Sequence, residues 1–69
     1  MNIGDKIFVN DSIGEVIVID VKKDYLILFR LDAGQFVKAN KYYYENGKLS
    51  WEHGAYYNNL DNLIQALEG

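Results

Sequence analysis

The chain has 69 residues, of which 49% are hydrophobic and none is cysteine or proline. This hydrophobic content predicts a single folded domain over residues 1–69, close to the size below which a core is hard to stabilise. The lack of cysteine excludes disulfides and thiolate metal sites. Seven basic and ten acidic residues give a net charge of −3, which counts against a nucleic-acid-binding module because phosphate neutralisation favours a basic surface.

The chain also lacks the signals of membrane insertion and export. No apolar run approaches the roughly 20 residues that a membrane helix needs. The first six residues, MNIGDK, have neither the basic start nor the apolar stretch of a signal peptide. We therefore expect a cytoplasmic protein with no membrane association.

The first expected strand covers residues 6–9, before a loop at 10–12. Two very apolar runs at residues 14–20 and 25–31 then predict a β-hairpin, because both are short and rich in β-branched and aromatic residues. Apolar residues occupy both faces of this hairpin, which is typical of strands covered on both sides. The remaining chain is therefore expected to cover both apolar faces of this hairpin.

A fourth strand is predicted over residues 35–44. Asp32 and Gly34 favour a three-residue loop before it, with Gly34 in the left-handed conformation. The apolar positions of the strand are odd-numbered up to Ala39 and even-numbered from Tyr42 onward. This change of phase predicts a bulge or bend at residues 39–41.

Asn46-Gly47 predicts a type I′ turn into the next strand. The turn sets a register in which Glu45 faces Lys48, Tyr44 faces Leu49, Tyr43 faces Ser50 and Tyr42 faces Trp51. In that register one face, expected to be buried, carries Tyr42, Tyr44, Leu49 and Trp51. His53-Gly54 is expected to turn the chain again, before a last short strand at residues 55–57.

The final element is predicted to be a helix in residues 58–69. Asn58 or Asn59 can cap it, and its apolar stripe consists of Leu60, Leu63, Ile64 and Leu67. Such a short helix is unstable alone, so we expect it to dock on the sheet formed by residues 1–57 or on a partner chain. The predicted class is mainly β with one helix: a small curled antiparallel sheet or barrel of five to six strands.

Residues 3–9 and 13–19 carry the pattern Gly-Asp-x-aliphatic-x-Val, a loop, and Gly-x-Val. This pattern resembles the opening of an SH3-like barrel of the KOW or Tudor type. RNA-binding members of the KOW type carry basic residues in the loop, whereas this loop reads Asn10-Asp11-Ser12. The small size and composition are also similar to those of small phage and mobile-element proteins.

No arrangement of residues predicts catalysis. His53 is the only histidine, so no partner completes a zinc site. The carboxylates are spread over strand ends and loops, and the glycines form no phosphate-binding fingerprint. We expect no enzyme activity, no metal site and no cofactor.

Aromatic residues are the one feature that suggests a binding surface. Six of them gather between residues 42 and 57, more than so small a domain readily buries. Exposed tyrosines are enriched in protein-binding sites, and aromatics beside lysines can also stack nucleobases. The candidate binding residues are Tyr43, Tyr56, Tyr57, Trp51, Lys38, Lys41 and Lys48.

These observations favour a non-catalytic interaction module whose partner is another protein or a second copy of the same chain. The alternative is a nucleic-acid-binding SH3-like module acting in transcription, translation or mobile-element control, which requires the three lysines to cluster beside exposed aromatics. A third hypothesis is an acidic inhibitor that occupies the nucleic-acid site of another protein.

Overall fold

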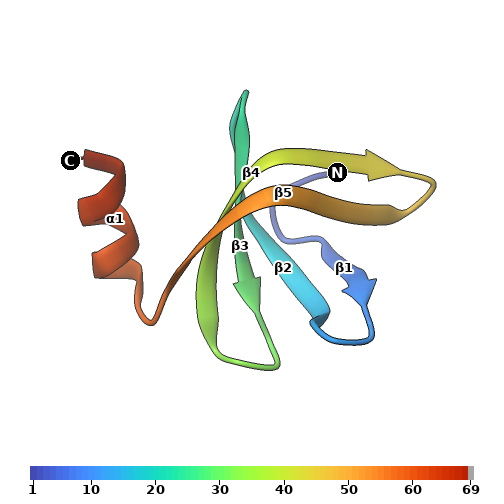
Figure 1. The fold of residues 1–69 in the computed structure, drawn as a ribbon, viewed down its shortest axis with the longest axis horizontal. Coiled ribbons are helices and arrows are strands. Elements are labelled where there is room, and N and C mark those ends of the chain that lie inside the picture. Colours follow the sequence, from blue (N-terminus) through green and yellow to red (C-terminus); the bar gives the residue numbers. More distant parts are fainter. Residues whose placement is uncertain (69) are drawn as a thin grey trace.

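The computed structural model describes residues 1–68 and confirms the mainly β class (Figure 1). Five strands pair antiparallel in sequence order and curl into a half-barrel. A short helix follows them, and Gly69 lies outside the described residues. The elements are β1 (Lys6–Asn10), β2 (Gly14–Val21), β3 (Tyr25–Arg30), β4 (Gln35–Glu45), β5 (Lys48–Tyr57) and α1 (Leu60–Glu68).

Two predicted turns, at Asn46-Gly47 and at Gly34, are confirmed. Asn46 and Gly47 both have positive φ, at 54° and 75°, and all four cross-strand pairs expected around them are present. Gly34 has a φ of 64°, and its amide donates a 2.8 Å hydrogen bond to the Arg30 carbonyl. The backbone conformations of these turn residues therefore fix the register of the β4–β5 hairpin and of the β3–β4 hairpin.

The predicted bend in β4 is also confirmed, and it lies at Lys41. Lys41 has a φ of 52° between the pairs Asn40–His53 and Tyr42–Trp51. The bend turns the far half of the β4–β5 hairpin across the concave side of the sheet (Figure 1). This bend in β4 contributes to the half-barrel shape of the sheet.

The concave side holds the hydrophobic core. Residues directly opposed in an antiparallel pair point to the same face, so the pairs Ile7–Val16, Val18–Leu28 and Leu28–Val37 trace this side across four strands. Leu26, Ala39 and Leu49 complete the buried cluster, against which Met1, Val9, Ile13, Tyr42 and Trp51 pack.

The convex side is also apolar, as expected from the two apolar faces of the β2–β3 hairpin. Ile27 is buried there, and the rings of Phe29 and Phe36 lie 5.0 Å apart at an angle of 57°. Helix α1 contacts β4 and β5 and buries Leu63. Its N-cap is Asn59, whose Oδ1 accepts a 2.9 Å hydrogen bond from the Asn62 amide.

Two expectations about strands β4 and β5 were wrong. The chain does not turn at His53-Gly54, because β5 continues without interruption through Tyr57 and Gly54 pairs with Ala39. There is consequently no sixth strand among residues 1–68. Tyr44 is 43% exposed rather than buried, because the tip of the β4–β5 hairpin extends beyond the rest of the sheet (Figure 1).

Candidate interaction groove

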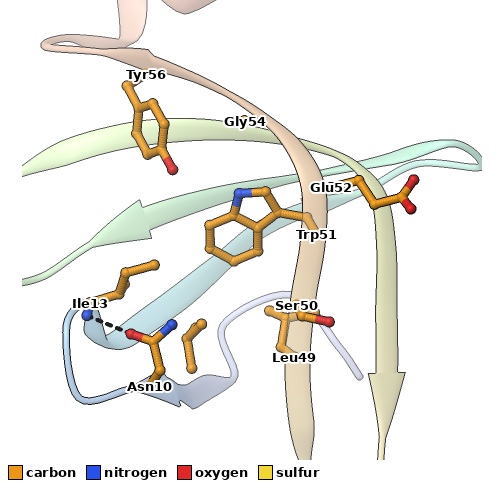
Figure 2. Close-up of a pocket in the computed structure, with 9 residues that line it drawn as sticks. Asn10, Ile13, Leu49, Ser50, Trp51, Glu52, Gly54 and Tyr56 are labelled. Atoms are coloured by element: carbon orange, nitrogen blue, oxygen red, sulfur yellow. Dashed lines mark hydrogen bonds between the residues drawn. The ribbon is translucent and has the colours of Figure 1, made fainter.

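The half-barrel is open along one side, where a groove of about 360 Å³ lies on the concave face. The strands at the two ends of the sheet, β1 and β5, contact each other but do not pair within the described residues. Figure 2 shows the groove, whose lining consists of Val9, Asn10, Ile13, Leu49, Ser50, Trp51, Glu52, Gly54 and Tyr56.

Two aromatic side chains of β5 converge in this groove. The Tyr56 hydroxyl points toward Trp51, and Ile13 lies across from them on the β1–β2 side (Figure 2). A Cβ atom at position 54 would lie 2.7 Å from Trp51 Nε1 and 3.1 Å from the Tyr56 hydroxyl oxygen. The absence of a side chain at Gly54 therefore lets both polar groups approach the strand backbone.

The wall of the groove opposite Trp51 and Tyr56 is formed by the loop between β1 and β2, which the Asn10 side chain orders through hydrogen bonds. Asn10 Oδ1 accepts hydrogen bonds from the amides of Ser12 and Ile13, at 2.9 and 2.8 Å. Such a cap mimics a backbone turn and orders a short loop. It fixes Ile13 at the edge of the groove.

Arg30 supports Tyr56 from the neighbouring part of the concave face. The guanidinium carbon lies 5.7 Å from the centre of the Tyr56 ring, a distance suited to a cation–π contact. The same guanidinium donates two hydrogen bonds to Asp32, at 3.0 and 2.7 Å. These hydrogen bonds hold the pKa of Asp32 below its usual range and raise the pKa of Arg30. The charge of Arg30 is thus already paired.

Glu52 is the charged residue of the groove lining, and its exposed side chain points to the other side of β5 from the Trp51 ring (Figure 2). The floor is formed by apolar side chains such as Leu49, which is buried. The lining also includes the hydrogen-bonding side chains of Trp51, Tyr56 and Ser50. An apolar floor with a few convergent polar groups is typical of a binding site.

The candidate binding residues do not form one cluster. Trp51 and Tyr56 share the groove. Tyr57 is half-buried on the convex side, opposite Phe36. Tyr43 and Lys48 lie at the hairpin tip, in a second hollow shared with Glu45.

The other two candidate lysines are separated from these tyrosines. Lys38 Nζ lies 4.7 Å from the centre of the Tyr25 ring on the convex side. Lys41 lies at the bend of β4, in a hollow shared with Lys23, Asp24 and Tyr42. The three candidate lysines therefore occupy three different parts of the surface.

Sequence reasoning missed several groove residues. The sequence pattern assigned no role to Val9 or Ile13, and it predicted a turn at Gly54. The available signal was a glycine inside a strand between Trp51 and Tyr56, because such a glycine often marks close approach to the backbone. The proximity of Ile13 to Trp51 had no local signal, since it depends on the curl of the sheet.

The histidine and the carboxylates form no second candidate site within residues 1–68. His53 is exposed in β5 opposite Asn40. Within residues 1–68, no group of three or more histidine, aspartate and glutamate side chains could hold a metal ion. No helix in the same range is long and apolar enough to cross a membrane.

No protein-family model matches this chain, and searches of curated proteins and of solved structures also give no significant match. The site is therefore interpreted from its own geometry.

Proposed function

We propose that this protein is a non-catalytic interaction module that binds a protein partner in the groove beside β5. The convergence of Trp51 and Tyr56 above Gly54 is the observation that supports this most strongly. Tryptophan and tyrosine combine a large apolar surface with a hydrogen-bonding group, and they dominate the energetics of many protein interfaces.

The expected ligand is an extended segment with an apolar side chain beside a lysine or arginine. The apolar side chain would fill the space between Trp51 and Ile13, and the basic residue would face Glu52. The free backbone edge of β5 can also hydrogen-bond an added strand, since β4 pairs only with its other edge. A chain with a net charge of −3 further favours a basic ligand.

An SH3-like relationship is part of the same proposal. The five antiparallel strands, their strong curl and the entry into β2 through Gly14 with a φ of 78° support it. The net charge of −3 and the separated lysines favour a protein ligand over RNA for such a module.

The single tryptophan of the chain provides a direct test, because its indole ¹H–¹⁵N resonance reports on the groove alone. Short peptides would be selected from a random displayed library against the intact protein and then titrated by NMR. We expect enriched sequences to pair an apolar residue with lysine or arginine, and to shift the indole resonance of Trp51. Glu52→Gln should weaken binding about two- to fivefold, the effect of losing an exposed ion pair.

The matched control is Glu45→Gln, which removes another exposed carboxylate, at the hairpin tip outside the groove. Its binding should equal that of the unmodified protein. Failure to enrich any peptide that shifts the Trp51 indole would overturn the proposal. Salt-sensitive shifts at Tyr43 and Lys48 with single- or double-stranded oligonucleotides would instead favour a nucleic-acid-binding module.

A further inference from the structure

Arg30 lies at the end of β3, beside the groove. It pairs with Gln35 of β4, whereas Tyr56 of β5 pairs with Val37, two residues further along β4. Side chains two residues apart on a strand point to the same face, so Arg30 and Tyr56 meet diagonally across β4 on the concave side. Arg30 therefore contributes to the surroundings of Tyr56 rather than to the groove lining itself.

The guanidinium of Arg30 is held in one orientation by Asp32. Its Nε donates to Oδ1 at 3.0 Å and its Nη2 donates to Oδ2 at 2.7 Å, a bidentate pair that fixes the plane of the guanidinium as well as its position. The loop that carries Asp32 is closed by the hydrogen bond from the Gly34 amide to the Arg30 carbonyl. Only 19% of the Arg30 side chain is exposed. The pair therefore presents a fixed cation to its neighbours.

Tyr56 is more exposed, at 45%, so burial alone does not set its orientation. A tyrosine in a strand has two common rotamers, with χ1 at about 180° or about −60°. In the rotamer of this structure the hydroxyl points toward Trp51 (Figure 2), and the ring lies 5.7 Å from the Arg30 guanidinium carbon. The cation–π contact therefore favours the rotamer that places Tyr56 in the groove.

We propose that Arg30 is the positioning residue of the groove: while paired with Asp32, it keeps the ring of Tyr56 in the groove rotamer. The ring then stays turned toward Trp51, and the binding surface is formed before a ligand arrives. This inference rests on the proposed binding of a protein ligand in the groove. A ligand that needs one rotamer binds more weakly in proportion to the fraction of molecules in that rotamer, and Arg30 raises this fraction without touching the ligand.

The arrangement requires an arginine rather than any cation. A planar guanidinium can bond a carboxylate through two parallel hydrogen bonds while it stacks on an aromatic ring. The ammonium group of lysine is a point charge on a flexible stem and cannot form such a bidentate pair. Lysine at position 30 would therefore keep the charge and lose the fixed orientation that Asp32 imposes.

Side-chain NMR couplings of Tyr56 test this role without any ligand. Three-bond couplings from the backbone nitrogen and carbonyl carbon to Cγ report the χ1 populations, and we expect a single rotamer in the unmodified protein. Arg30→Gln should give averaging between two rotamers, and Arg30→Lys should do the same. Dispersed amide resonances of Val16 and Leu28 would show that each variant is folded. Averaging in the unmodified protein, a single rotamer in Arg30→Gln, or full recovery by Arg30→Lys would overturn the proposal.

Peptide affinity supplies the second readout. For peptides that shift the Trp51 indole resonance, Arg30→Gln should weaken binding about two- to fivefold, the effect of losing one exposed cation–π contact. In a Tyr56→Leu background the same change should have little effect, because the ring that Arg30 holds is gone. An equal loss in both backgrounds would mean that Arg30 meets the ligand directly, which contradicts a positioning role.

The matched control is Lys22→Gln, which removes the cation of another exposed ion pair, with Asp20 at 3.2 Å, outside the groove lining. It should change neither the Tyr56 rotamer nor the peptide affinity, and a matching effect would overturn the proposal. The two proposals fail separately. Absence of any groove-binding peptide would overturn the proposed function while the couplings still decide the role of Arg30. An unheld Tyr56 in a protein that binds peptides would overturn this inference alone.

Discussion

At the scale of single residues, Gly54 has the most specific role. Its φ is not in the left-handed region, so the backbone itself would accept another residue. The constraint comes from Trp51 Nε1, which occupies the space that a Cβ atom would need. The groove therefore depends on the absence of one methyl group.

Replacing Gly54 by alanine should displace the Trp51 ring and lower the stability of the fold. The expected cost is about 1–3 kcal/mol in the free energy of unfolding, as for other overpacked sites. Urea denaturation followed by circular dichroism measures this cost, and the indole resonance reports the displacement.

The control is the same Gly54→Ala change in a Trp51→Leu background, where the clash is removed. The cost there should fall well below that in the unmodified protein, giving a coupling energy between the two positions. An equal cost in both backgrounds would show that glycine is needed for another reason.

At the scale of elements, α1 depends on its surroundings. Nine residues are too few for a stable isolated helix, so its cap and the contact of Leu63 must hold it in place. The cap is a single hydrogen bond from the Asn62 amide to Asn59 Oδ1. The adjacent Asn58 instead bonds Gln35 on the sheet, at 3.0 Å between the two side chains.

Asn59→Ala should therefore fray α1 while leaving the sheet intact. Loss of an N-cap costs about 1 kcal/mol, enough to increase amide exchange throughout a helix with one buried anchor. Hydrogen exchange measured by NMR would show the change in residues of α1 and not in β3.

Asn58→Ala is the matched control, because it removes an exposed side-chain hydrogen bond outside the cap. Its effect on exchange in α1 should be clearly smaller. Equal effects of the two substitutions would contradict the assignment of Asn59 as the cap.

At the scale of the whole molecule, the two sides of the sheet contribute unequally. The concave core joins residues from all five strands, including Ile7 on β1 and Leu49 on β5. The convex side buries only Ile27 and Leu63 among its large hydrophobic residues within 1–68. The core therefore holds the sheet together, and the helix is a separable addition.

This difference predicts contrasting outcomes for two leucine substitutions. Leu28→Ala should cost about 2–5 kcal/mol, a large part of the roughly 3–10 kcal/mol expected for a domain of this size. It should abolish cooperative unfolding and collapse the dispersion of the NMR spectrum.

Leu63→Ala should instead detach α1 locally and retain a folded sheet. Helical circular dichroism should fall while the Trp51 indole resonance stays in place. Global unfolding by Leu63→Ala would show that the helix is integral to the core.

The sequence by itself determined the first four strands, the start of β5, the register around Asn46-Gly47, a bend within residues 39–41 and the helix. These features depend on the conformational preferences of residues close together in the chain, such as Asn46-Gly47, and on the spacing of apolar side chains. The length and apolar content of the β2–β3 hairpin also indicated a sheet with two apolar faces.

Only the tertiary structure decided how those faces are covered and which aromatics meet. Gly54 looked like a turn residue because its role depends on Trp51 folding back over the strand. Tyr44 looked buried because its pairing with Leu49 was known while the projecting hairpin tip was not. Contacts such as that of Ile13 with the β5 groove join residues far apart in sequence, and they arise from the curl of the whole sheet rather than from local propensity.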